Sequence, residues 1–106
     1  MTECTKRPLI DMAVLEQIAP IIHTTAHPLR LRILDFLDSE GRPCTVGQIT
    51  EACGVAQSFV SQQLRILKDQ HILSCRRQGN FVFYEIARPT LLHLLKCIRT
   101  QTGGSD

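Results

Sequence analysis

The sequence contains no long apolar segment, which limits where the protein can act. No apolar run approaches the ~20 residues that a membrane-spanning helix needs. The first residues, M-T-E-C-T-K-R-P, have no apolar stretch behind their basic pair and so do not resemble a secretory signal. We therefore expect a cytoplasmic protein without a membrane partner.

Catalytic and zinc-ribbon patterns are absent as well. We find no paired acid and base, no phosphate-binding loop and no nucleophile beside an oriented base, so an enzyme is not expected. The five cysteines include no C-x-x-C pair, which excludes a zinc ribbon and a thioredoxin-type motif. In a reducing cytosol these cysteines are expected to be free thiols.

The overall charge gives little information about partners. A net charge of +2 permits nucleic-acid binding only if the basic residues are clustered. Hydrophobic residues make up 43% and charged residues 21% of the 106 positions, as in an ordinary globular chain. A single domain with a modest core is expected.

The first third of the chain has the apolar spacing of helices. Residues 9–26 carry apolar side chains at helical intervals, and Pro20 predicts a kink or a break near Ala19. A second helix is expected to begin after His27, because a proline then occupies its first turn.

The middle of the chain predicts two further helices that are joined by a tight turn. Thr45 and Gln48 have the spacing of a capping box at the start of one helix. Gly54 is expected to end that helix, and the next should run over about 57–70.

The remaining pattern completes a winged helix. Residues 72–75 and 81–86 are rich in apolar and β-branched side chains and flank a Gly-Asn turn, which predicts a β-hairpin. Pro89 opens a last helix. The predicted fold class is mainly α with a β-hairpin wing, a winged helix-turn-helix in the order α-α-α-α-β-β-α.

The helix over 57–70 has two contrasting faces. At about 100° per residue, Val60, Leu64 and Leu67 fall in one narrow arc that should pack inward. Small or uncharged hydrogen-bonding residues and one arginine occupy the opposite side, as a helix that reads base edges in the major groove requires. The candidate DNA-binding residues are Gln57, Ser58, Ser61, Gln62 and Arg65. The plainer interpretation is a solvated helix surface.

The hairpin tip provides a second candidate contact with DNA. Arg76, Arg77 and Asn80 lie around Gly79, and basic residues on a short ribbon suit phosphate contact and minor-groove entry. The alternative is an ordinary charged, solvated turn.

Three segments together resemble the ArsR/SmtB family of bacterial winged-helix repressors. They are A-H-P-L-R-L-R-I-L at 26–34, V-G-Q-I-T-E-A-C-G-V-A-Q-S-F-V-S-Q-Q-L-R-I-L at 46–67 and R-R-Q-G-N-F-V-F-Y-E-I at 76–86. The resemblance extends over about residues 10–100. It implies a homodimer through the first and last helices, a double-stranded DNA operator, and release of the operator by an inducer.

The sequence also predicts a domain organisation. Residues 1–8 would be a flexible N-terminal tail, 9–101 the winged-helix domain for DNA binding and dimerisation, and 102–106 a flexible C-terminal tail. The chain departs from the family at Ala56, where the common serine would cap the recognition helix. Alanine cannot provide this cap.

The family's known inducer sites are altered in this chain. Thr45-Val46-Gly47 stands where the metalloid-binding members have C-V-C, and Asp35 replaces the cysteine of the persulfide sensors. Arg88, Thr90 and Gln101 occupy the positions of zinc ligands on the last helix. The inducer therefore cannot be inferred from these sites.

Two other pairs of residues are candidates for sensing. Cys4 in the N-terminal tail could approach Cys44 of a partner protomer, and His93 lies four residues before Cys97 on one helix face. Either pair could sense a soft metal, a metalloid or an oxidant through cysteine. Unrelated surface or packing residues are the alternative for both pairs. A winged-helix protein-interaction module and an inducer-independent regulator remain alternatives for the whole chain.

Overall fold

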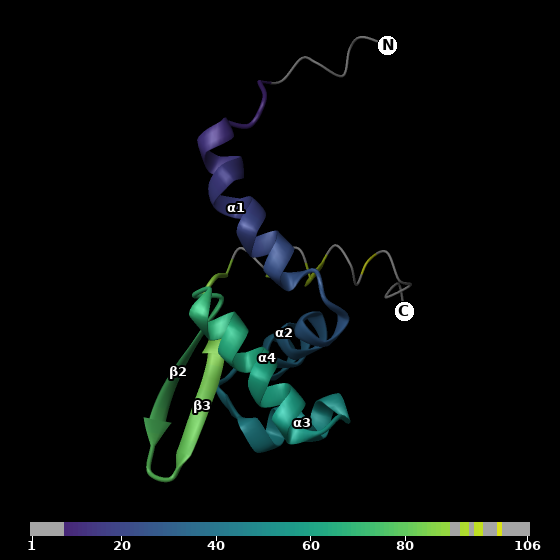
Figure 1. The fold of residues 1–106 in the computed structure, drawn as a ribbon, viewed down its shortest axis with the longest axis vertical. Helices are drawn as coiled ribbons and strands as arrows, with labels where there is room; N and C mark the ends of the chain where they lie inside the picture. The colour runs from purple at the N-terminus through teal and green to yellow at the C-terminus, as the bar shows by residue number, and fades with distance from the viewer. Residues whose placement is uncertain (1–7, 90–91, 94, 97–99, 101–106) are drawn as a thin grey trace.

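The computed structural model describes residues 8–89, 92–93, 95–96 and 100. In Figure 1, α2, α3 and α4 form the body, the β2–β3 hairpin projects from it, and α1 extends away on the other side. This arrangement confirms the predicted winged helix-turn-helix. In chain order the elements are α1 (Met12–Thr25), α2 (Pro28–Glu40), β1 (Cys44–Thr45), α3 (Val46–Cys53), α4 (Gln57–Asp69), β2 (Leu73–Gln78) and β3 (Phe81–Ile86).

Local signals set the helix ends as the sequence predicts. At the start of α2, His27 Nδ1 accepts a hydrogen bond from the Leu29 N–H at 3.2 Å. The capping box of α3 is present: the Thr45 hydroxyl accepts from the Gln48 N–H at 3.2 Å, and Gln48 Oε1 accepts from the Thr45 N–H at 2.9 Å. Gly54 ends α3 at φ 72°, a left-handed conformation that glycine adopts without steric cost.

Of the kink or break expected near Ala19, the break does not occur. Helix α1 continues through Pro20 to Thr25 as one element. Proline removes the hydrogen bond to the Glu16 carbonyl. Both Glu16 and Pro20 are exposed, so water can donate to that carbonyl instead.

The core lies between the helical body and the inner face of the sheet. Both helices of the helix-turn-helix, α3 and α4, contribute side chains to the core, which fixes the turn between them. The buried apolar side chains are Ile21, Ile33, Leu34, Leu37, Cys44, Ile49, Val60, Leu64, Leu67, Ile72, Leu73 and Leu95.

The sheet has three strands in the order β1-β3-β2, all antiparallel. The short strand β1, which the sequence did not predict, pairs Cys44 with Tyr84 and Thr45 with Phe83. A strand of two residues is too short to show a period-2 pattern in the sequence.

The hairpin also differs from the prediction in its length. Strand β2 continues to Gln78, so only Gly79 and Asn80 remain in the turn. Arg76 and Arg77, expected in the tip, are strand residues that pair with Phe83 and Val82.

Some sequence predictions fall outside the described residues. They concern the two terminal tails that were predicted to be flexible, Cys4 and Cys97. The last helix is described only in part: Leu92, His93, Leu95 and Lys96 are helical, and Leu95 is buried against the core. Within the described part of the chain, no helix is both long and apolar enough to cross a membrane.

Candidate nucleic-acid interface

The two faces of α4 separate as its sequence pattern requires. Val60, Leu64 and Leu67 are fully buried in the core. The five candidate DNA-binding residues are all exposed: Gln57, Ser58, Ser61, Gln62 and Arg65. One side of the helix therefore fixes its position, while the other presents hydrogen-bonding groups to solvent.

The N-terminus of α4 has no side-chain cap. Ala56 is the N-cap residue and makes no side-chain hydrogen bond. The first backbone N–H groups of a helix have no intrahelical partner and carry partial positive charge. An uncapped, exposed helix start of this kind can donate to a DNA phosphate oxygen.

Phe59 lies beside the polar residues of α4. Half of its surface is exposed, although it is a large apolar side chain. An exposed phenylalanine on a recognition helix can contact the methyl group of thymine. Sequence reasoning did not select this residue, although an apolar ring next to polar neighbours on the outer face was an available signal.

The opposite side of α4 contains a buried glutamine that sequence reasoning missed. Gln63 is 6% exposed, and its Oε1 accepts a hydrogen bond from Arg30 Nε at 2.7 Å. The same arginine donates through a terminal nitrogen to the Thr24 carbonyl at 2.8 Å. Helical periodicity was the signal that could have found it, since Gln63 falls about 60° from Val60.

The wing presents its two arginines on opposite faces. Successive strand residues point to opposite sides of a sheet, so Arg76 shares a face with its partner Phe83, and Arg77 with Val82. Both arginines and Asn80 are exposed. The arginines are therefore unequal candidates for contact with DNA.

The Arg76 face of the wing also carries an aromatic pair. Phe81 is 61% exposed, and its ring meets that of Phe83 edge-to-face, with centroids 6.5 Å apart and planes at 63°. The other face is continuous with the core through Leu73 and Ile86. An exposed apolar ring at a wing tip can pack on sugar or base surfaces of a groove.

Two of the described cysteines, Cys44 and Cys53, lie in surroundings that disfavour the thiolate, while Cys75 in β2 is a half-buried free thiol. Cys44 is buried, and its Sγ donates to the Arg42 carbonyl at 3.4 Å. Burial raises the pKa of the Cys44 thiol, although the nearby Arg42 charge opposes this effect. Burial likewise raises the pKa of Cys53. A raised pKa keeps a thiol neutral and therefore weakly nucleophilic and a poor metal ligand.

The remaining sensing candidates are not assembled among the described residues. His93 is exposed on the last helix, away from Cys44 in sequence, and its intended partner Cys97 lies outside the described residues. Nowhere in the described part of the chain do three His, Cys, Asp or Glu residues converge as a metal site would require.

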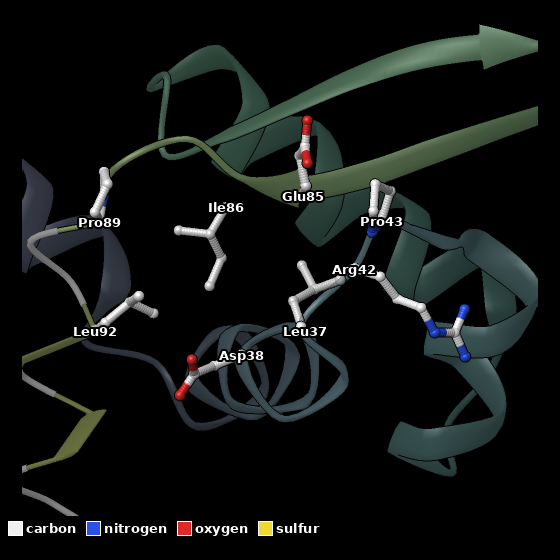
Figure 2. A pocket seen from close by; sticks show the side chains of 9 residues that line it. Leu37, Asp38, Arg42, Pro43, Glu85, Ile86, Pro89 and Leu92 are labelled. Atoms are coloured by element: carbon white, nitrogen blue, oxygen red, sulfur yellow. The ribbon is translucent and has the colours of Figure 1, made fainter.

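A separate cleft of about 240 Å³ lies between the end of α2 and the end of β3. Figure 2 shows Leu37, Ile86 and Leu92 around its centre, whereas Arg42 and Glu85 direct their charged ends away from it. The centre of the cleft is therefore apolar, while the Asp38 carboxylate also lies along its lining.

The fold and the exposed recognition helix define a winged-helix DNA-binding regulator, and comparison with known proteins gives the same class. The profile of the bacterial regulatory protein, arsR family, matches residues 27–74. An uncharacterized HTH-type transcriptional regulator of Mycobacterium tuberculosis is 38% identical over 82 residues, which cover 76% of this chain and 70% of that protein.

Solved structures agree. The AntR antimony-specific transcriptional repressor has a TM-score of 0.83 and 28% identity, over 99% of this chain and 94% of that one. The homodimeric winged helix-turn-helix DNA-binding domain Mb0332 of Mycobacterium bovis has a TM-score of 0.71 and 26% identity, over 92% of this chain and 89% of that one. The chain belongs to the ArsR family and is a transcriptional repressor of that family.

Proposed function

We propose that two copies of this chain bind a two-fold-related operator in double-stranded DNA and leave it when an inducer binds. The observation that carries the proposal is the exposed polar face of α4 on a helix whose other side is locked into the core. Each α4 would enter one major groove, with the wing beside it.

The side chains of α4 suit distinct parts of the DNA surface. Gln62 can bond bidentately to adenine, and Ser58 and Ser61 can bond to several base edges. Arg65 can serve guanine or phosphate. The wing arginines would add phosphate contacts that fix the position of the protein on the duplex.

Self-association is supported by the surface of α1. Met12, Leu15 and Ile22 lie along one side of this helix and are 64%, 40% and 50% exposed. An apolar stripe of this extent is typical of a protein contact rather than a solvated surface. The homodimeric Mycobacterium bovis neighbour supports the same assignment.

The DNA-binding part is tested by a double substitution on α4. Gln62→Ala with Arg65→Ala should lower affinity for a duplex selected from random DNA by the wild-type protein by about a hundredfold or more. Arg42→Ala is the charge-matched control, because the Arg42 side chain is exposed, lies outside α4 and the wing, and forms an ion pair with Glu40. Fluorescence anisotropy at fixed salt measures both.

Two results would contradict the proposal. Equal affinity of the double variant and the wild type would remove α4 as the reading element. Failure of the wild type to bind any DNA in a salt-dependent way would instead favour a protein-interaction module.

For the inducer, we propose a soft metal or metalloid ion, or an oxidant, acting through cysteine. Its support is the likeness to AntR, an antimony-specific repressor that matches nearly the whole chain. Because Cys44 is buried, the site would have to open locally or use Cys4, Cys97 and His93.

The inducer is tested by titrating the protein–DNA complex with antimonite, arsenite, cadmium, zinc and peroxide. Release by one of them that is lost in Cys44→Ser or Cys97→Ser, but retained in Cys53→Ser, supports thiol sensing. If none releases the DNA, the thiol-sensing proposal is wrong and an inducer-independent regulator is favoured.

A further inference from the structure

A part-buried polar contact behind the recognition helix joins three helices. Arg30 lies on α2, bonds to Gln63 of α4 at 2.7 Å, and bonds to the carbonyl of Thr24, in the last turn of α1, at 2.8 Å. We call Arg30, Gln63 and the Thr24 carbonyl the three-helix bridge.

The hydrogen bonds of the three-helix bridge constrain the orientation of the groups that they join. A guanidinium group is planar and rigid, and it is charged, so its two hydrogen bonds fix the partner atoms in direction as well as distance. The Thr24 carbonyl is also one of the last in α1, where a helix has unpaired acceptors and partial negative charge. The arginine thereby satisfies the end of α1 and the side chain from α4 at once.

Apolar packing alone would hold α4 less specifically. Val60, Leu64 and Leu67 fix the helix against the core, but burial of apolar surface is non-directional and tolerates small rotations. Gln63 directly follows Gln62 of the exposed face. A rotation of α4 that broke the bridge would therefore turn the reading face as well.

The bridge also lies between α4 and the helix with the exposed apolar stripe. Thr24 belongs to α1, whose residues Met12, Leu15 and Ile22 form the contact for a second copy under the proposed function. A connection from α1 to α4 would set where each recognition helix lies relative to the dimer axis. Operator half-sites are read at a spacing that matches the separation of the two recognition helices.

We propose that Arg30 and Gln63 are positioning residues for DNA recognition, which fix the orientation of α4 relative to α1 and so select the spacing of the operator half-sites. This inference rests on the proposed function. Neither residue touches DNA; both act through the face of α4 that Gln62 and Arg65 occupy.

The test is the double substitution Arg30→Met with Gln63→Met. Removing both side chains leaves neither of them with an unpaired polar group, and the Thr24 carbonyl that loses its donor is only part-buried and can accept from water, so the fold should be retained. The probes are the duplex selected by the wild type and two versions with one base pair inserted or deleted between its half-sites. The preference for the original spacing should fall about tenfold.

Two controls separate positioning from a loss of contacts or of stability. The slope of log affinity against log salt should stay at the wild-type value, since no phosphate contact is removed. Gln70→Met changes an exposed glutamine at the end of the same helix and should leave the spacing preference unchanged. Gln63→Glu, which retains an acceptor for Arg30, should keep most of the preference and serves as the conservative control.

The outcomes distinguish the two proposals. If the double variant, or Gln63→Met alone where the double variant does not fold, discriminates spacing as the wild type does, the bridge has no positioning role and DNA binding stands. If the wild type selects no duplex, the proposed function fails and the positioning role fails with it.

Discussion

At the scale of single residues, the two wing arginines should differ in their contribution to DNA binding. Arg76 and Arg77 point to opposite faces of the hairpin, so one face at most can lie toward the DNA backbone. Substituting the arginine that contacts phosphate by alanine should reduce the salt slope by about 1 for each wing, and the other substitution should leave it nearly unchanged. Affinity measured over a range of salt concentrations checks this.

The matched control for the wing is the other arginine, because both variants lose the same charge from the same strand. If Arg76→Ala and Arg77→Ala reduced the salt slope equally, the face of the hairpin on which an arginine lies would not determine whether it contacts phosphate. The Phe81–Phe83 pair lies on the Arg76 face of the wing. Phe81→Ser should lower DNA affinity if that face lies toward the DNA.

Residue roles on α4 could be predicted from the sequence where they depend on periodicity. The inward Val60 and Leu64 and the exposed Ser61 and Gln62 follow from helical spacing alone. The inward position of Gln63 follows from the same spacing, but its hydrogen-bond partner could not be predicted, because Arg30 lies 33 positions earlier in the sequence. Polar side chains are normally exposed, and only a long-range hydrogen bond makes one favourable in the interior.

At the scale of elements, helix ends were predicted best where a capping box or a C-terminal glycine marks them in the sequence. The capping box at Thr45 and the left-handed Gly54 set both ends of α3, since each depends on residues within one turn. Pro20 was a weaker signal: its effect depends on whether water can reach the freed carbonyl, which is decided by the exposure of α1.

Strand lengths were predicted less well than helix ends. The Gly-Asn turn was placed correctly, but β2 proved to extend through both arginines to Gln78. Polar, exposed strand residues have no apolar alternation to mark them, and pairing with β3 holds them in the sheet. The strand β1 exists only because β3 lies beside Cys44 and Thr45 in the folded chain.

At the scale of the whole molecule, the exposed stripe on α1 predicts a dimer that DNA binding requires. Leu15→Asp places a carboxylate within that stripe and should weaken self-association by about a hundredfold or more, because burying an unpaired charge is costly. Sedimentation velocity and DNA affinity should change together. The fold, followed by circular dichroism, should be retained because Leu15 is not part of the core.

The control for the dimer is Ala13→Asp, which adds the same charge on another side of the first turn of α1. It should leave the sedimentation coefficient at the wild-type value. A dimer that survives Leu15→Asp would assign self-association to a different surface and leave the stripe without a role.

Thr45 gives the molecule a mechanical property through its two simultaneous roles. Its backbone pairs with Phe83 in the sheet, while its side chain caps α3. No flexible linker therefore separates the wing from the start of α3. The wing and the helix-turn-helix should move together as one rigid unit. A contact that displaced either the wing or the helix-turn-helix would therefore displace both. The position of the wing is therefore set by the same residue that sets the start of α3.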